Sequence, residues 1–142
     1  EIVESVGTNT KMNEFQAAMG LCVLDDMEVI LKKRKLLHET YIKKLKGHLK
    51  LPQWNSKGSQ NYGYFPVLFE NEEKLLAAQQ KLNENEIYPR RYFYPSLNSL
   101  SYLESSIRTP VSEDICRRVL CLPVYVSLSK KDVTRVVEIL LS

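Results

Sequence analysis

The sequence contains few residues that could build a disulfide framework or a metal site. Its three cysteines are an odd number and include no C-x-x-C pair: they are Cys22, Cys116 and Cys121. The only two histidines, His38 and His48, are not spaced to present two ligands on one helix face. These features argue against a disulfide-stabilised scaffold and against a zinc site, so we predict no bound metal.

Long apolar stretches and a strong net charge are also missing. No apolar run approaches the ~18 residues that suggest a membrane-spanning helix, and no charged and then apolar leader opens the chain. Lysine and arginine number 20 against 17 acidic residues, and the resulting charge of +3 is too mild to indicate a nucleic-acid partner. We therefore expect a cytoplasmic protein that binds neither membranes nor nucleic acids.

The length of 142 residues suits one domain with a sizeable core, and there is no internal repeat or low-complexity tract. We predict a single domain over residues 1–142, with a long helical arm at 1–47 and a compact α/β unit at 61–142. The chain begins with Glu1 instead of Met and stops within an apolar helical pattern at residues 140–142. We expect from these ends a piece of a larger protein.

Residues 7–24 join a polar turn to a helical pattern. Residues 7–10 are polar and poor in helix formers. Apolar residues then recur at intervals of three, four and three, at Met12, Phe15, Met19 and Cys22. This spacing is typical of one helix face and predicts a helix that starts near Lys11.

Two interpretations of this helix start are open. The free N–H groups and the positive dipole end of the helix would lie beside Asn9 and the ammonium group of Lys11, a combination that suits an anion such as phosphate. Alternatively, Thr10 or Asn9 caps the helix and no ligand is involved.

The helical pattern continues to about residue 45. Acidic residues cluster at the start of this part and lysines at its end, which favours the dipole of a second helix, so we predict a break near Leu24 and Asp25. Gly47 is a natural helix stop. The basic run at residues 32–35 could be a nucleic-acid or targeting patch, but an apolar stripe interrupts it on the helix, and we favour a solvated face.

A compact unit follows a loop at residues 48–60 that carries Trp54. Strands are predicted at residues 62–69, 87–92 and 119–122, and Pro66 makes the first an edge or bulged strand. Helices are predicted at residues 71–82, 112–118 and from 130 onward, and their N-caps are Asn71, Ser112 and Ser129. The fold class is α/β (α+β), with a long N-terminal helix followed by a small sheet covered by helices.

The run RRYFYP at residues 90–95 is a second candidate for chemistry. Its two guanidinium groups beside three aromatic rings could grip phosphate oxygens and stack on a base or a sugar ring. The structural alternative is a strand whose alternate residues enter the core and whose arginines meet acidic neighbours.

Five parts of the sequence resemble one enzyme family in the order that the family uses. They are GTNTKMNEFQAAMGL at residues 7–21, Arg34, NYGYFPVLF at 61–69, RRYFYPSLN at 90–98 and VLCLPVY at 119–125. Together they resemble the C-terminal part of the DegT/StrS family, the pyridoxal-phosphate-dependent aminotransferases of nucleotide-linked keto-sugars. The resemblance implies the C-terminal domain of a fold-type I transferase, with a mainly antiparallel sheet, in a chain that lacks the large cofactor-binding domain.

The resemblance also assigns roles to particular residues. In that family the Asn and the basic residue of the first motif reach across a dimer interface to the cofactor phosphate of the neighbouring subunit, which implies this role for Asn9 and Lys11. Arginine is more frequent at the second place, so Lys11 implies a point-charge contact. The segment at 90–98 lies near the sugar-nucleotide, which makes Arg90 and Tyr92 substrate-binding candidates.

The implied function is that of the C-terminal domain of a homodimeric aminotransferase, which moves an amino group, from glutamate, to a nucleotide-linked keto-sugar. The family's Schiff-base lysine lies upstream, so we expect no catalytic residue in this chain and no activity of the chain alone. A hypothesis from another class is a non-enzymatic module that dimerises through the long helix and binds an acidic partner through a basic surface. Binding that weakens steeply with salt would indicate the latter.

Overall fold

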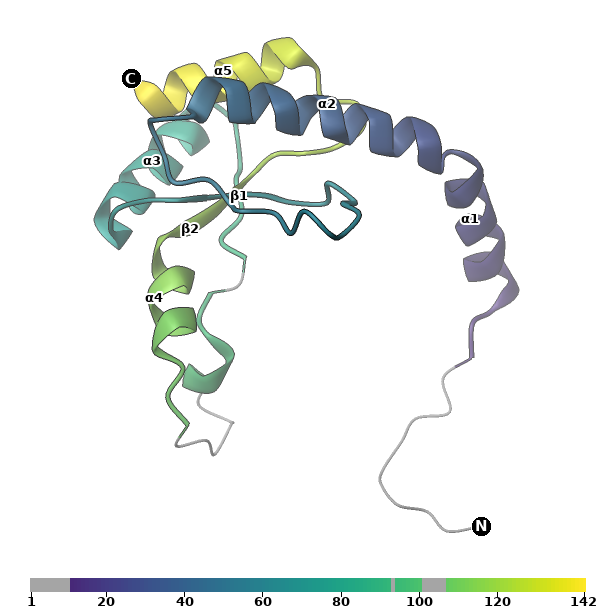
Figure 1. Ribbon diagram of the computed structural model, residues 1–142, viewed down its shortest axis with the longest axis horizontal. Helices are drawn as coiled ribbons and strands as arrows, with labels where there is room; N and C mark the ends of the chain where they lie inside the picture. The colour runs from purple at the N-terminus through teal and green to yellow at the C-terminus, as the bar shows by residue number, and fades with distance from the viewer. Residues whose placement is uncertain (1–10, 93, 101–106) are drawn as a thin grey trace.

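The computed structural model describes residues 11–92, 94–100 and 107–142, and Figure 1 shows how they are arranged. Two helices come first: α1 spans Glu14–Asp25 and α2 spans Met27–Leu45. The break between them confirms the predicted one. Beyond α2, Gly47 has a φ of +88°, a left-handed conformation that a residue without a Cβ adopts without strain, which confirms the predicted helix stop.

α1 begins three residues later than the apolar spacing predicted. Asn13 is the N-cap: its side chain accepts a hydrogen bond from the backbone N of Gln16 at 2.9 Å, and Gln16 Oε1 accepts one from the backbone N of Asn13 at 3.1 Å. This capping box satisfies two backbone groups that a helix start otherwise leaves free. The prediction that Thr10 or Asn9 caps the helix was therefore wrong, and the conformation predicted for residues 7–10 lies outside the described residues.

α1 contributes no side chain to the core. None of its residues is buried, and Phe15 is 84% exposed and Met19 70% exposed. Figure 1 shows α1 at the far end of α2, turned away from the sheet. No helix within the described ranges is long and apolar enough to cross a membrane. The large apolar side chains of α1 therefore form a surface that the described residues leave uncovered.

The sheet consists of two antiparallel strands in the part of the chain that is described. β1 (Phe65–Leu68) pairs with β2 (Val119–Leu122) in a register that places Phe65 opposite Leu122 and Pro66 opposite Cys121. β1 is shorter than predicted because Tyr62 has a φ of +52° and cannot continue a strand. β2 has the predicted bounds.

The strand predicted at residues 87–92 is reduced to a single bridge. Arg90 and Cys121 exchange two backbone hydrogen bonds, at 3.2 and 2.9 Å, on the side of β2 away from β1. Pro89 precedes this point and has no N–H, so the pairing cannot extend in that direction. The segment therefore lies beside the sheet without forming a full third strand.

Two of the later helices begin at their predicted N-caps. α3 (Glu72–Glu84) follows Asn71, whose side chain accepts a hydrogen bond from the backbone N of Lys74 at 2.9 Å. α5 (Lys130–Leu141) follows Ser129, which forms the predicted capping box with Asp132.

α4 (Pro110–Arg118) starts earlier than predicted. Thr109 occupies the N-cap position and Pro110 the first helical position. The N–H that proline lacks would have no partner within the helix at this position, so the helix loses no hydrogen bond. Ser112 was predicted as the cap, but it lies in the first turn, and its Oγ is 3.0 Å from Ser96 Oγ. Ser96 comes just before a short 3-10 helix, Leu97–Ser99.

The core lies where α2, α3 and α5 cover one face of the sheet. α2 packs along α5, which also contacts α3. The buried side chains include Leu37, Tyr41, Leu45, Phe65, Val67, Leu75, Leu82, Leu120, Leu122, Val133 and Val136. Leu76 of α3 and Leu141 of α5 lie outside this core and are 48% and 43% exposed. The predicted fold class, an α+β domain with an antiparallel sheet covered by helices, is confirmed.

Candidate functional site

The other face of the sheet carries a groove of about 800 Å³. Side chains alternate across a strand, so Pro66 and Cys121 point away from the core and line the groove. The apolar and aromatic residues that form its walls are Met27 and Leu31 of α2, Trp54, Tyr62 and Tyr64 of the loop before β1, and Tyr92. We call this feature the aromatic groove.

Two Asx turns shape the loop that forms one wall of the groove. Asn55 Oδ1 accepts a hydrogen bond from the backbone N of Lys57 at 2.9 Å, and Asn61 Oδ1 accepts one from the backbone N of Gly63 at 3.0 Å. A Cβ at Gly63 would lie 3.2 Å from Asn61 Oδ1, so a larger residue would crowd this turn. The turns place Tyr62 toward α2 and leave Tyr64 at the groove.

Arg90 and Tyr92 lie together at one end of the aromatic groove. Both line a second cavity of about 240 Å³, and this cavity adjoins the groove, since Tyr64, Tyr92 and Cys121 line both. Arg90 is exposed, and its backbone is held by the bridge to Cys121. Burial raises the pKa of the Cys121 thiol, which keeps this neighbour neutral.

Tyr64 belongs to the groove and not to the core. Its side chain is 54% exposed, and its ring meets the ring of Tyr92 edge to face at 5.1 Å between centroids. Tyr62 does pack: it is half-buried, and its ring lies 5.2 Å from that of His38 on α2. Sequence reasoning missed Tyr64 because the positive φ of Tyr62 interrupts the strand alternation.

Arg91, the neighbour of Arg90, has a structural role. Its guanidinium donates hydrogen bonds to Glu72 Oε1 at 2.6 Å and to the carbonyl oxygen of Arg117 at 3.0 Å. The same group lies 3.8 Å above the ring centre of Tyr94. Each of the two interpretations of the arginine pair therefore applies to one arginine. Arg91 meets an acidic neighbour, as expected for a structural role, whereas Arg90 lines the cavity, as expected for a binding residue.

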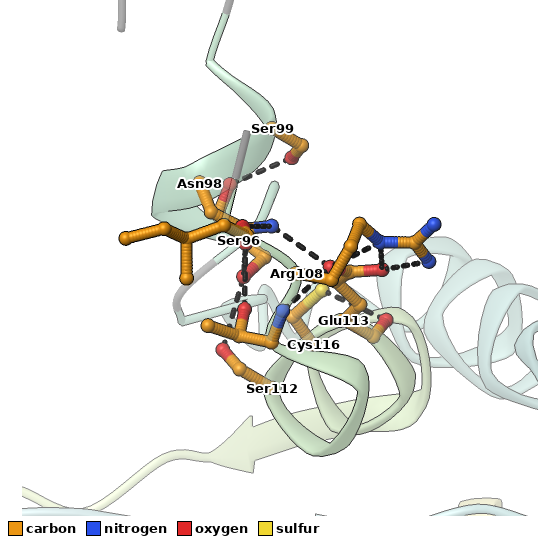
Figure 2. A network of polar contacts seen from close by, with 9 residues as sticks. Ser96, Asn98, Ser99, Arg108, Ser112, Glu113 and Cys116 are labelled. Atoms are coloured by element: carbon orange, nitrogen blue, oxygen red, sulfur yellow. Dashed lines mark hydrogen bonds and ion pairs between the residues drawn. The ribbon is translucent and has the colours of Figure 1, made fainter. Parts of the chain in front are cut away.

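A polar network anchors the end of the segment that carries Arg90 and Tyr92 (Figure 2). The amide of Asn98 makes four hydrogen bonds: Nδ2 donates to the carbonyl oxygen of Ile107 at 3.3 Å and to Glu113 Oε1 at 2.8 Å. Oδ1 accepts from Ser96 Oγ at 2.7 Å and from Thr109 Oγ1 at 2.8 Å. All the donors and acceptors of this amide side chain are therefore used.

Glu113 ties the network to α4. Arg108 donates to both its carboxylate oxygens, at 2.6 Å from Nη2 to Oε2 and 3.0 Å from Nε to Oε1, and the backbone N of Thr109 donates at 2.9 Å. Hydrogen bonds from Arg108, Thr109 and Asn98 lower the pKa of Glu113 to about 2. The sequence offered Asn98 only as the last residue of a motif, with no indication of its partners.

Of the two cofactor-binding candidates, only Lys11 lies among the described residues. Lys11 is exposed, precedes α1 and lines neither cavity, and Asn9 lies outside the described residues. At the start of α1, Asn13 accepts the hydrogen bond of the backbone N–H of Gln16, and Glu14 places a negative charge in the first turn. Both features compete with an anion at this helix N-terminus.

The basic run on α2 is a solvated face, as we favoured. Lys32 pairs with Glu28 at 2.7 Å, and Lys35 lies 4.0 Å from Glu39. Arg34 is half-buried. These contacts neutralise part of the run and do not favour a nucleic-acid surface. Within the described ranges there is also no group of three or more residues that could hold a metal ion.

The sequence matches the profile of the DegT/DnrJ/EryC1/StrS aminotransferase family over residues 1–141. The chain belongs to this family. It is 32% identical over 148 residues to dTDP-4-amino-4,6-dideoxy-D-glucose transaminase of Escherichia coli, an alignment that covers 98% of this chain and 40% of that protein. The chain thus spans about 40% of the length of this relative.

Solved structures of the family have the same fold. DesI, determined in the presence of its TDP-sugar product, superposes with a TM-score of 0.84 at 26% identity, over 94% of this chain and 36% of DesI. TlmJ of Streptoalloteichus hindustanus superposes with a TM-score of 0.84 at 22% identity, over 98% of this chain and 38% of TlmJ. The fold is therefore that of part of a fold-type I aminotransferase, and the family's aminotransferases depend on pyridoxal phosphate.

Proposed function

We propose that this chain is the C-terminal domain of an aminotransferase that transfers an amino group, from glutamate, to a nucleotide-linked keto-sugar. The observation that carries the proposal is the convergence of Arg90 and Tyr92 at the end of the aromatic groove. The similarity of the chain to a dTDP-sugar transaminase, and to DesI determined with its TDP-sugar product, supports the same class of substrate.

The groove offers the two kinds of contact that such a substrate needs. Aromatic faces, among them the exposed ring of Tyr64, can pack against a sugar ring, and the guanidinium of Arg90 can bind diphosphate oxygens through paired hydrogen bonds. Arg91 cannot share this task because Glu72 and Tyr94 already hold its guanidinium. Arg90 therefore binds and orients the substrate, and Tyr92 packs beside it.

The cofactor contact is assigned to Asn9 and Lys11, which would hold the phosphate of pyridoxal phosphate in a neighbouring subunit of a homodimer. Support comes from Lys11, which is exposed, and from α1, which projects from the body without burying any residue. The cofactor supplies the electron sink for moving the amino group. In this proposal residues 1–47 form the arm that reaches the neighbour, residues 61–142 form the compact unit, and the enzyme works in the cytoplasm.

The test is a steady-state assay of the full-length parent with glutamate and a dTDP-linked 4-keto-sugar. Arg90→Met should raise KM for the sugar nucleotide roughly ten- to a hundredfold, because a hydrogen-bonded charge contact is worth about 1.5 to 3 kcal/mol. Arg117→Met is the matched control, since Arg117 is exposed and contacts Arg91 through its carbonyl oxygen. A parent that aminates free keto acids but no nucleotide-linked keto-sugar would refute the proposal.

A further inference from the structure

His38 is a buried histidine directly behind the aromatic groove. Its side chain is 1% exposed, and neither ring nitrogen has a hydrogen-bond partner among the described residues. Its ring lies among three aromatic rings, with centroid distances of 5.9 Å to Trp54, 5.2 Å to Tyr62 and 5.0 Å to Phe65. Buried polar groups without a partner are rare and costly, so this arrangement requires an explanation.

Two of these three rings form the groove wall. Trp54 and Tyr62 line the aromatic groove and also contact His38, whereas Phe65 belongs to the core face of β1. His38 therefore connects α2 to the loop that shapes the groove. One turn earlier on α2, Arg34 has a buried Nε that likewise lacks a partner among the described residues.

We propose that His38 is a positioning residue for the aromatic groove: as a neutral imidazole it packs behind Trp54 and Tyr62 and holds them as a wall, and its protonation releases that wall. The neutral ring can pack against aromatic faces at little cost. The imidazolium would be a buried charge without an anionic partner, next to the positive charge of Arg34. The proposal concerns the shape of the groove and does not depend on the reaction catalysed.

The direction of the pH effect follows from the surroundings of the ring. Burial lowers the pKa of His38 from its ordinary value of 6.5, and the charge of Arg34 lowers it further. The polar backbone of Tyr62, which lies near the ring without forming a hydrogen bond to it, acts in the opposite direction. Arg34 from α2 and Tyr62 from the loop are the titratable groups that face the ring, and Trp54 and Phe65 are uncharged. The wall is therefore held fully above pH 6.5 and is released as the pH falls below it.

The size of the effect can be bounded. When the wall is released, His38 meets water and its pKa returns toward 6.5. Between that value and the lowered pKa of the packed state, each unit of pH changes the ratio of released to packed wall by up to about tenfold. Below the lowered pKa the ratio stays constant.

The experiment measures acrylamide quenching of Trp54, the single tryptophan of the chain, from about pH 8 to about pH 5, with far-UV circular dichroism at each pH. We expect the quenching constant to rise below pH 6.5 while the helical signal stays unchanged. His38→Phe, which keeps an aromatic ring but cannot be protonated, should remove the rise. His48→Gln is the matched control, because His48 is the other histidine and is exposed, and it should keep the rise.

Three results would overturn the proposal. They are a quenching constant that stays flat with pH in the unmodified chain, a rise that persists in His38→Phe, and a rise that coincides with loss of the helical signal. If His38→Phe does not fold, NMR titration of the two histidine rings of the unmodified chain replaces it, with His48 as the internal reference. The titration of His38 must then coincide with the rise in quenching, and a mismatch would contradict the proposal.

Discussion

Replacing Asn98 tests whether the polar network holds the segment that carries Arg90 and Tyr92. Asn98 makes three hydrogen bonds to neutral groups and one to the carboxylate of Glu113. Neutral bonds contribute about 0.5 to 1.5 kcal/mol each, and a bond to a charged group about 1.5 to 3 kcal/mol. Because Asn98 is half-exposed and water can replace some of these bonds, we expect Asn98→Ala to lower the free energy of unfolding by about 2 kcal/mol.

Asn98→Asp is the sharper variant because it nearly preserves the shape of the side chain. It replaces the Nδ2 donor, which lies 2.8 Å from Glu113 Oε1, with an oxygen that carries negative charge. Glu113 is ionised at neutral pH because its pKa is about 2, so two like charges would meet. At an effective dielectric constant near that of a protein surface, the repulsion should cost at least about 1 kcal/mol beyond the loss in Asn98→Ala.

Urea unfolding at pH 7, followed by circular dichroism, measures both variants. Asn98→Asp should unfold at a lower urea concentration than Asn98→Ala, and the double variant Asn98→Asp/Glu113→Gln should regain part of the difference, since it removes one of the two charges. An Asn98→Asp variant as stable as Asn98→Ala would refute the network, because no anion would then lie beside Nδ2.

Three further predictions follow from the core, the network and the cofactor assignment. Leu120→Ala should lower the free energy of unfolding by about 2 to 5 kcal/mol in urea unfolding, because Leu120 is fully buried, whereas Leu76→Ala at a 48% exposed position should cost well under half of that. The lowered pKa of Glu113 means that its contribution to stability is complete above pH 4.5 and is lost as the pH falls toward about 2, so Glu113→Gln should flatten the stability profile over that range. In the full-length parent, Asn9→Ala should weaken cofactor retention roughly ten- to a hundredfold in a titration followed by absorbance, since hydrogen bonds to a charged oxygen contribute about 1.5 to 3 kcal/mol; unchanged retention would contradict the phosphate assignment.

The elements that sequence reasoning predicted well are those with local causes. Asn71 caps the backbone N–H of Lys74, three residues further along the chain, and Ser129 and Asp132 form their capping box within four residues. Gly47 stops α2 because its left-handed conformation favours a residue without a Cβ. Such signals require only near neighbours in the chain, so the sequence contains them completely.

The errors arose where several local signals compete. Thr10, Asn9 and Asn13 are all suitable N-caps, and only Asn13 has a Gln three residues later that returns a hydrogen bond. Ser112 has an acidic residue beside it, but Pro110 comes first and starts α4. The capping residues were thus present in the sequence. The choice among them depended on neighbouring residues, Gln16 for α1 and Pro110 for α4, and not on the spacing of apolar residues.

The site depends on contacts between distant parts of the chain. The alternation of side chains along a strand predicts that Arg90 and Arg91 point to opposite sides. Only the packing of α3 shows that Arg91 meets Glu72 and that Arg90 lines the cavity. The partners of Asn98 come from residues 96 to 113, and the rings around His38 come from the loop and from β1. The sequence by itself determined the local helix signals, the strand period and the family. The tertiary structure alone decided which polar side chains are satisfied and which face the groove, because that depends on which surfaces meet when the helices pack on the sheet.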